Sequence, residues 1–275
     1  MLLLDAFRVH ALYDPGNTAI CDNLGRSYTY RQIWNTSELL GAHLLEQGER
    51  GALPAGATVG VVGTAEPLIV SCILAAAKTG HPHTLLGSGR QAFAKTQDYA
   101  VVLAASSQLA ADLKLAQGLA QGQDAVAAET MAAATRTRYT TQTPHSPQPP
   151  AKVFDAELML SYIVPGMTDD FSCGCGTADC SHGPFLQECM PSEWLKSNAT
   201  FCMQTDGTTL TASEHDTLLT KALTKADDEA DTDATKKATG TTPTLSIDIQ
   251  EQPQLTLCNT NLAAALAKGQ QVNLT

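Results

Sequence analysis

The sequence predicts an α/β protein built on a doubly wound parallel sheet flanked by helices. Two continuously apolar segments, Thr58–Val62 and Ala100–Ala104, are typical of buried parallel strands, and Thr84–Leu86 is a third strand candidate. Helical patterns at Ala65–Lys78 and Gln91–Tyr99 separate these strands along the chain. Strands that alternate with helices at this spacing favour a parallel sheet with right-handed crossovers.

The N-terminal residues predict a helix and then a small hairpin. Asp5–Leu12 has a helical pattern, and Ala19–Cys21 and Ser27–Thr29 are predicted as two short strands. Gly25 lies in the Asn-Leu-Gly-Arg turn between them, where glycine can adopt a left-handed conformation.

A capping box predicts where the next helix begins. Thr29 and Gln32 form the T-x-x-Q pattern in which each side chain bonds the other residue's backbone N–H. The helix could run to Gln47, with Gly48 as its C-terminal stop. One apolar stripe should be buried: Ile33, Trp34, Leu40, Leu44 and Leu45.

The sequence beyond Ser107 loses this regular periodicity. Gln108–Ala134 is rich in Ala and Gln and could form one long helix. Cys173–Cys202 is rich in Cys and Gly, and Lys221–Thr242 is a charged, Thr-rich segment that we expect to be mobile. Short apolar stretches lie between them: Leu158–Val164, Phe201–Gln204 and Leu255–Ala267.

These changes in composition predict three regions. Residues 1–134 form an N-terminal α/β subdomain, and residues 135–151 form a Pro- and Thr-rich linker. Residues 152–275 form a divergent Cys- and Thr-rich continuation.

The composition argues against nucleic-acid binding and against a membrane-spanning segment. The net charge is −11 and the sequence pI is about 4.9, whereas binding to nucleic acid needs a basic surface. No apolar run approaches the roughly 20 residues that a transmembrane helix needs. The start, MLLLDAFRVH, makes a poor secretion signal, which predicts a cytoplasmic protein. A mitochondrial address is the alternative, because this start has some amphipathic-helix character.

The order of elements up to about residue 109 resembles the N-terminal part of the AMP-forming adenylating enzymes, which include acyl-CoA synthetases. The matching phrases are LLDAFRVHALYDPGNTAI, CDNLGRSYTYRQIW, AHLLEQG, GATVGVVGTAEPLIVSCILAAAKTGHPHTLL and QDYAVVLAASSQL. Within that family, the D-x-x-G-R-x-Y-T-Y form and the closing VVLA are most similar to acyl-CoA synthetases of the malonyl or short-to-medium-chain type.

The resemblance implies a two-step ligase reaction. A carboxylic acid reacts with ATP, assisted by Mg²⁺, to give an acyl-adenylate and pyrophosphate. A thiol such as coenzyme A then takes the acyl group. The implied cofactors are therefore ATP and Mg²⁺, and the implied partners are a small carboxylate and coenzyme A.

The family's phosphate-binding loop, roughly T-S-G-T-T-G-x-P-K-G, has its best candidate in TDGTT. The resemblance assigns cofactor binding to four residues there: Thr205, Gly207, Thr208 and Thr209. Asp206 replaces the family's Ser and brings negative charge, and no Gly-x-Pro-Lys-Gly follows. Two interpretations stay open: a diverged phosphate loop, or a chance product of a Thr-rich sequence.

A second partial match to the family's loop sequence lies further along the chain. Ala238–Thr242 reads ATGTT, and Gln252–Gly269 is similar to the family's tail and helix after the loop, with Gln254 in place of the Lys and Asn259 in place of the His. One interpretation is a single phosphate loop split by a low-complexity insertion.

Other groups of residues in the sequence give weaker indications of a binding or catalytic site. Cys173-x-Cys175-x4-Cys180-x-His182, with Cys189 nearby, has zinc-type residues, but the C-x-C pair is too crowded for a usual structural site, so unpaired thiols are the default. The short Gly-x-x-Gly run after Val59 lacks the third glycine of a dinucleotide loop. No G-x-S-x-G motif indicates a hydrolase. Four single histidines are expected to be core or surface residues: His10, His43, His81 and His83.

Two functions follow from these observations. The family's later elements, including the ribose-binding Asp and the C-terminal domain with its catalytic Lys, have no counterpart before Thr275. The first function is therefore a truncated or divergent ligase, weak or inactive alone, and no catalytic residue is assigned. The alternative is a non-catalytic scaffold or regulatory protein that keeps the fold and binds a protein partner.

Overall fold

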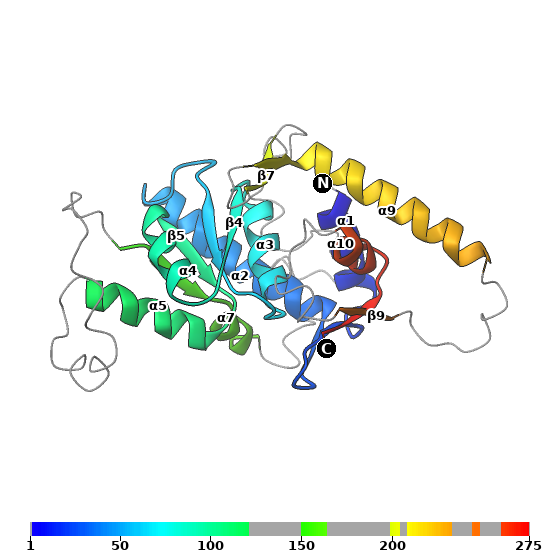
Figure 1. The fold of residues 1–275 in the computed structure, drawn as a ribbon, viewed down its shortest axis with the longest axis horizontal. Coiled ribbons are helices and arrows are strands. Elements are labelled where there is room, and N and C mark those ends of the chain that lie inside the picture. The colour runs from blue at the N-terminus through cyan, green and yellow to red at the C-terminus, as the bar shows by residue number, and fades with distance from the viewer. Residues whose placement is uncertain are drawn as a thin grey trace, which may run out of the picture.

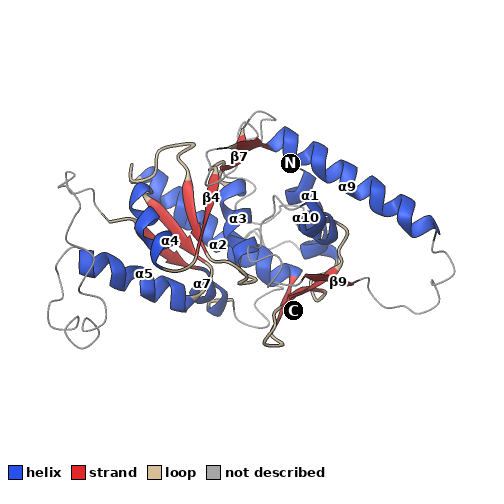
Figure 2. Cartoon of the chain, viewed as in Figure 1, coloured by secondary structure: helices blue, strands red, loops and turns tan. Residues whose placement is uncertain are grey.

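The computed structural model describes residues 2–120, 150–163, 199–203, 208–232, 244–247 and 260–274. Its helices are α1 (Leu2–Tyr13), α2 (Tyr30–Glu49), α3 (Ile69–Lys78), α4 (Arg90–Lys95), α5 (Ser107–Ala120), α7 (Ala156–Ser161), α9 (Ala212–Thr232) and α10 (Thr260–Ala267), with a 3-10 turn at Thr96–Asp98 (Figure 1). Its strands are β1 (Thr18–Cys21), β2 (Ser27–Thr29), β3 (Val59–Val62), β4 (His83–Gly87), β5 (Val101–Ala104), β6 (Lys152–Asp155), β7 (Thr200–Met203), β8 (Thr209–Thr211), β9 (Thr244–Ile247) and β10 (Gln271–Leu274) (Figure 2).

The larger sheet has six strands in the order β6-β5-β3-β4-β7-β8. Every neighbouring pair is parallel except β7 and β8, which form an antiparallel hairpin at one edge. The chain passes from β3 to β4 on one side and then to β5 and β6 on the other, so the order of strands reverses at β3. The predicted mixed α/β fold with a parallel sheet is confirmed.

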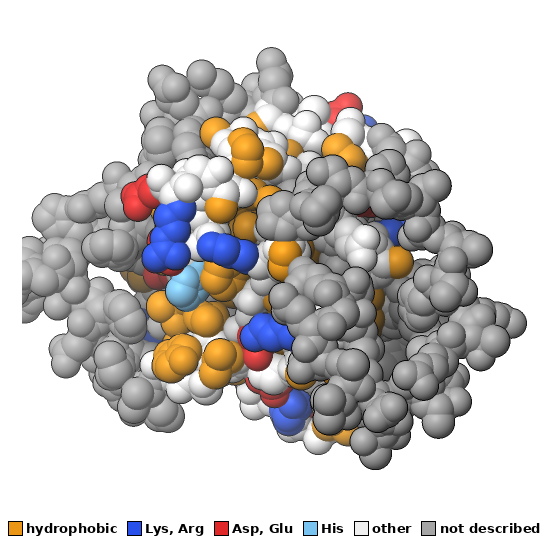
Figure 3. All heavy atoms as spheres, turned by 90° about the vertical axis from the view of Figure 1, so that its left-hand side faces the viewer, with side chains coloured by type: hydrophobic (Ala, Val, Ile, Leu, Met, Phe, Trp, Pro, Cys, Tyr) orange, Lys and Arg blue, Asp and Glu red, His pale blue; other side chains and the backbone are white. Residues whose placement is uncertain are grey.

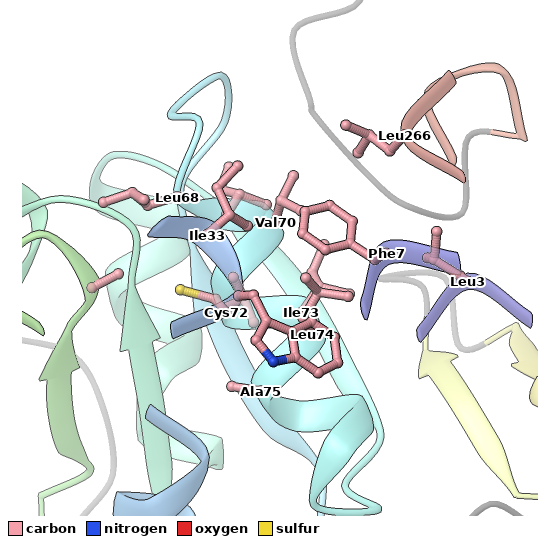
Figure 4. Close-up of a cluster of buried hydrophobic side chains, with 14 of the residues drawn as sticks. Leu3, Phe7, Ile33, Leu68, Val70, Cys72, Ile73, Leu74, Ala75 and Leu266 are labelled. Carbon is pink, nitrogen blue, oxygen red and sulfur yellow. The ribbon is translucent and has the colours of Figure 1, made fainter. Parts of the chain in front are cut away.

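Helices cover both faces of this sheet and bury two apolar clusters. The larger cluster lies between the sheet and helices α1, α2, α3 and α10, and it includes Phe7, Ile33, Leu74 and Leu266 (Figure 4). The smaller cluster joins side chains of β3 and β5, such as Val62 and Val102, to the α4 and α5 side. Burial of α3 is nearly complete, because its residues from Ile69 to Ala76 are all shielded from solvent.

A second sheet, with strand order β2-β1-β10-β9, was not expected from the sequence. β1 pairs antiparallel with β2, as predicted, and Gly25 in the turn has φ +79°. On its other side β1 pairs in parallel with β10, where Ile20 lies opposite Val272. The first and last strands of the described chain therefore share one sheet, and α1 and α10 lie side by side (Figure 1).

Polar contacts close the N-terminal helices onto the end of α10. The Tyr30 hydroxyl lies 3.1 Å from the Leu266 carbonyl oxygen and 2.9 Å from that of Gln270. His10 Nε2 lies 3.0 Å from the Ala267 carbonyl oxygen. Backbone N–H groups just after α10 donate to the carbonyls of Ala264, Ala265 and Leu266, so the distant His10 side chain completes the helix end at Ala267.

Helix α2 begins as predicted and ends slightly later. Thr29 accepts from the Gln32 backbone N–H at 3.2 Å, and the Gln32 side chain accepts from the Thr29 backbone N–H at 2.9 Å, which confirms the capping box. The expected stop at Gly48 is wrong by a few residues. The helix continues to Glu49, and the glycine with positive φ is Gly51, at +70°.

Two other expected boundaries are also wrong. Helix α3 starts at Ile69 and not at Ala65, because Glu66 turns back to accept from the Thr64 backbone N–H at 2.6 Å. The segment from Lys221, expected to be mobile, is helical as far as Thr232 within α9. That helix is held by apolar side chains at helical spacing: Leu219 is fully buried, and Ala222 and Leu223 pack on the same core.

Both halves of the chain contribute strands to both sheets. β6 and β7 extend the sheet begun by β3, β4 and β5, and β9 and β10 complete the sheet begun by β1 and β2. The proposed linker, residues 135–151, lies almost wholly outside the described residues. Among the helices that the structure describes, none is both long and apolar enough to cross a membrane.

Candidate functional site

The candidate site is the carboxyl edge of the six-stranded sheet. In open α/β sheets ligands bind outside the carboxyl ends of the strands, near the point where the strand order reverses. Three glycines with positive φ lie at this edge: Gly63 after β3, and Gly87 and Gly89 at and after β4. The Gly63 backbone N–H donates to the Gly87 carbonyl at 2.9 Å, which joins the two strand ends.

The space around Gly63 is too small for a side chain. A Cβ atom there would lie 2.8 Å from the Ile69 side chain and 3.0 Å from the Ala105 Cβ. Close packing of β3 against the start of α3 therefore requires glycine at this position. The run after Val59 that looked like a weak dinucleotide loop is explained as a packed strand end.

The polar side chains at this edge whose contacts are known bond the local backbone. Asp155, at the end of β6, accepts from the Leu158 backbone N–H at 3.0 Å and caps α7. Ser106, after β5, lies with its hydroxyl oxygen 3.4 Å from the Leu109 backbone nitrogen. Behind the edge, burial raises the pKa of Cys72, and the nearby carboxylates of Asp155 and Glu66 add to the effect. A neutral, buried thiol of this kind is a poor nucleophile.

The predicted phosphate loop joins the two strands of the β7–β8 hairpin. β7 runs parallel to β4 and pairs with it where Cys202 lies opposite His83, the first residue of β4. β7 therefore points toward the carboxyl edge, but its last residue, Met203, lies near the start of β4. In the hairpin Met203 pairs with Thr209. Of the four predicted residues, Thr209 is the first residue of β8 and Thr208 is exposed just before it. Thr205 and Gly207 lie outside the described residues.

The hairpin leads directly into α9 through a second capping box. The Glu214 carboxylate accepts from the Thr211 backbone N–H at 2.8 Å, and the Glu214 backbone N–H donates to the Thr211 hydroxyl at 3.2 Å. The Thr211 backbone bond lowers the pKa of Glu214, so this carboxylate is charged at neutral pH. The N-terminus of α9 therefore carries its own anion and is a poor place for a phosphate.

An aromatic group lies beneath the hairpin. The Phe201 ring of β7 lies 5.0 Å from the His83 ring and 4.6 Å from the His215 ring, between centroids. His83 is 1% exposed, and within the described part of the chain neither of its ring nitrogens has a hydrogen-bond partner. Both histidines are core residues under the strands, as expected for His83 from the sequence.

The sequence of the hairpin and of the start of α9 has a net negative charge. The sequence has no Lys or Arg between Lys196 and Lys221, while it places Asp206, Glu214 and Asp216 in that interval. On another face of the molecule, the side on which α5 lies, basic side chains are seen next to acidic and apolar ones (Figure 3). A triphosphate at the hairpin would have to rely on backbone N–H groups, threonine hydroxyls and its own metal ion.

The other predicted site residues fall in different places. The residues of the possible zinc cluster, Cys173 to Cys189, lie outside the described residues, and among those that are described no group of three His, Cys, Asp or Glu could hold a metal. His43 stacks on Phe154 at 5.0 Å between ring centroids, and His81 Nδ1 lies 2.9 Å from the Ala57 carbonyl oxygen. These histidines have structural surroundings, as the sequence suggested.

The interpretation of a phosphate loop split by an insertion stays a prediction, because most of its residues lie outside the described part of the chain. Of the residues on either side of TDG, Met203 of β7 pairs with Thr209 of β8. The helix Thr260–Ala267, once compared with the family's helix after the loop, belongs to the other sheet and leads into β10. Ala238–Thr242, Gln254 and Asn259 lie outside the described residues.

The fold is similar to several solved structures of adenylate-forming enzymes. A nonribosomal peptide synthetase aligns with a TM-score of 0.53 and 13% identity over 100% of this chain and 22% of its own. A fatty acyl-adenylate ligase from L. pneumophila, solved with acyl adenylate and pyrophosphate, gives 0.52 and 14% over 99% of this chain and 39% of its own. O-succinylbenzoate coenzyme A synthetase (MenE) from Bacillus subtilis gives 0.50 and 13% over 98% and 43%.

The similarity is one of structure and not of sequence. No protein-family model and no curated protein matches the sequence. The chain spans between 22% and 43% of the length of the three enzymes named above. The alignment covers nearly all of this chain but less than half of each of those larger enzymes. The chain therefore has the fold of part of an adenylate-forming enzyme.

Proposed function

We propose that this protein is a divergent member of the AMP-forming acyl-CoA synthetase group. The chemistry of that group is ATP-dependent activation of a carboxylic acid, followed by transfer of the acyl group to a thiol such as coenzyme A. The observation that carries the proposal is the fold similarity to adenylate-forming enzymes, which is joined by a T-D-G-T-T sequence between β7 and β8. The strand before that sequence, β7, points toward the carboxyl edge of the sheet, where open α/β sheets bind ligands.

The proposed nucleotide contacts come from the hairpin. Thr208 and Thr209 would donate hydroxyl hydrogens to phosphate oxygens, together with Thr205 and backbone N–H groups near Gly207. Mg²⁺, bound with ATP, would supply the positive charge that the hairpin lacks. The residues fit a nucleotide only in part, because Glu214 is fully committed to capping α9 and adds a negative charge.

This charge pattern is the reason to propose weak activity. In a phosphate site each unbalanced carboxylate opposes binding, and no Lys or Arg of the sequence lies between residues 197 and 220 to offset Asp206. We therefore propose weak ATP·Mg²⁺ binding and little or no ligation by this chain alone.

Titration calorimetry with ATP and Mg²⁺ tests the binding. We expect heat of binding at millimolar ATP, a several-fold loss of affinity in Thr208→Val, and a gain of affinity in Asp206→Ser, which removes the opposing charge. Thr217→Val is the matched control, because Thr217 is an exposed threonine on α9 whose hydroxyl bonds its own helix. No response at millimolar ATP from the wild type or from Asp206→Ser would overturn the proposal.

Pyrophosphate release measures the chemistry separately from binding. A panel of short- and medium-chain carboxylic acids with ATP and Mg²⁺ should give release far below that of a complete synthetase, and none in the absence of acid. Release at the rate of a complete synthetase would contradict the weak activity proposed here.

The second candidate function is a non-catalytic scaffold or regulatory protein that retains the fold. The acidic, lysine-free hairpin favours it, since the charge that a triphosphate needs is missing from that part of the sequence. Under this alternative neither the wild type nor Asp206→Ser binds ATP, yet both unfold cooperatively with equal midpoints. Binding together with pyrophosphate release excludes it.

A further inference from the structure

Lys78, the last residue of α3, has an almost completely buried ammonium group. The residue is 2% exposed, and its Nζ donates to the Ser37 hydroxyl at 2.7 Å. The same nitrogen lies 3.4 Å from the Trp34 carbonyl oxygen and 3.1 Å from the centroid of the Trp34 ring. All of these groups belong to α2, so one side chain joins the two most extensively packed helices of the molecule.

Two other charged groups act on Lys78 from the helices packed against it. The Glu38 carboxylate of α2 lies 3.7 Å from Nζ, and the guanidinium of Arg8 on α1 opposes the positive charge. Burial is the largest effect and lowers the pKa of Lys78 to about 7, although Glu38 acts in the opposite direction. Burial likewise raises the pKa of Glu38, against the pull of Lys78.

We propose that Lys78, Trp34, Ser37 and Glu38 form a proton-binding switch between α2 and α3. In mildly acidic solution Lys78 is an ammonium group that contacts the indole face and the Glu38 carboxylate. In mildly alkaline solution it is a neutral amine that keeps only its hydrogen bonds to Ser37 and the Trp34 carbonyl. The proton moves between Nζ and solvent, and no other group gains or loses a proton.

The geometry explains why the proton is weakly held. An ammonium group in water is solvated on all sides, whereas here it has one good acceptor, one long one and an aromatic face. A single carboxylate at 3.7 Å does not replace that solvation, and Arg8 offsets part of its attraction.

The effect on stability has a definite sign. In the unfolded chain Lys78 keeps its proton up to about pH 10, but in the folded chain it loses it near neutrality. The unfolded state therefore binds more protons between these two values, and the free energy of unfolding rises with pH across that interval. The raised pKa of Glu38 has the opposite effect at lower pH. Just above the ordinary pKa of a glutamate the folded state binds more protons, so there the free energy of unfolding falls as the pH rises.

The titration of Lys78 in the wild-type protein tests the switch directly. In ¹³C-labelled protein the lysine Cε resonance that is missing from Lys78→Met should titrate with a midpoint near pH 7, while exposed lysines titrate near pH 10. A midpoint for Lys78 above pH 9 overturns the proposal, and this measurement does not depend on the variant's stability.

Trp34 provides a second, optical readout. The protein has two tryptophans, so a Trp194→Phe background leaves Trp34 as the reporter. Its emission should change with a midpoint near pH 7 and lose that change in Lys78→Met, but not in Lys114→Met, which alters an exposed lysine of α5. The urea midpoint should rise between pH 7 and pH 9 in the control and stay flat in Lys78→Met. Equal pH dependence in the two variants contradicts the proposal.

Discussion

At the scale of single residues, Gly269 is a position where two independent features, the backbone conformation and a close side-chain neighbour, both favour glycine. Its φ is +72°, and a Cβ atom would lie 2.5 Å from the His10 ring. That ring cannot move aside freely, because it lies 3.0 Å from the Ala267 carbonyl oxygen and packs against Tyr30. The second residue after α10 is thereby restricted to glycine both by its own backbone and by His10 of α1, far away in the sequence.

Gly269→Ala should therefore destabilise the protein by more than its conformation alone explains. Alanine at positive φ costs about 1–2 kcal/mol, and displacement of His10 adds the loss of its hydrogen bond, roughly another 1 kcal/mol. Gly25→Ala is the matched control, since Gly25 has φ +79° but open space around its Cβ position. Urea unfolding should give a larger loss for Gly269→Ala, and equal losses would show that the His10 contact carries no energy.

At the scale of elements, the N-terminal half was predictable because its signals are local. Gly25 marks the turn between β1 and β2, and Thr29 and Gln32 mark the start of α2; the structure has both features. β3 and β5 were predictable because buried parallel strands are continuously apolar. The end of α2 was less predictable, since Gly48 and Gly51 are both plausible stops and only the bonds from Arg50 and Gly51 decide between them.

The start of α2 yields a quantitative expectation. Thr29→Ala removes the oxygen that accepts from the Gln32 backbone N–H and should lower the free energy of unfolding by about 1 kcal/mol. Thr29→Ser keeps that oxygen and should cost much less. Urea denaturation of the two variants checks this, and an equal cost for both would mean that the cap does not stabilise α2.

The elements that could not be predicted are short, and they form only because they pack or pair with residues far away in the sequence. β9 and β10 each have four residues, in Thr- and Gln-rich sequence, and only pairing with each other and with β1 makes them strands. α9 was also hard to predict, because its sequence is charged and Thr-rich and few of its residues, such as the buried Leu219, mark an apolar face. In the candidate site the sequence placed Thr208 and Thr209 in a loop after an apolar stretch, but it predicted neither β8, which begins at Thr209, nor the capping role of Glu214.

At the scale of the whole molecule, the smaller sheet joins the two ends of the described chain. Val272 and Leu274 of β10 are buried, and Val272 lies opposite the fully buried Ile20 of β1. α10 adds buried leucines, among them Leu262 and Leu266, to the core that surrounds Phe7. The N-terminal hairpin and α1 therefore pack in part against residues 260–274.

Removal of residues 260–275 should abolish cooperative folding of the remainder. The deletion exposes β1 as an open edge and uncovers α1. It also removes three buried leucines, Leu262, Leu266 and Leu274, whose loss at roughly 2–5 kcal/mol each is comparable with the 5–15 kcal/mol stability of a typical domain. Circular dichroism with urea denaturation measures this. Deletion of residues 233–243, which lie between α9 and β9, is the comparison, and an unchanged unfolding midpoint in the 260–275 deletion would refute the expectation.

The pairing of Ile20 with Val272 also has a consequence for how the protein is made. During synthesis the parallel partner of β1 leaves the ribosome only after a long delay, because Cys21 and Gln271 are 250 residues apart in the sequence. Contacts between residues so far apart in sequence form slowly, because a long loop must close before they contribute. For that interval the edge of β1 that will face β10 has unpaired backbone N–H and C=O groups, which makes it open to pairing with other strands until residue 274 is available.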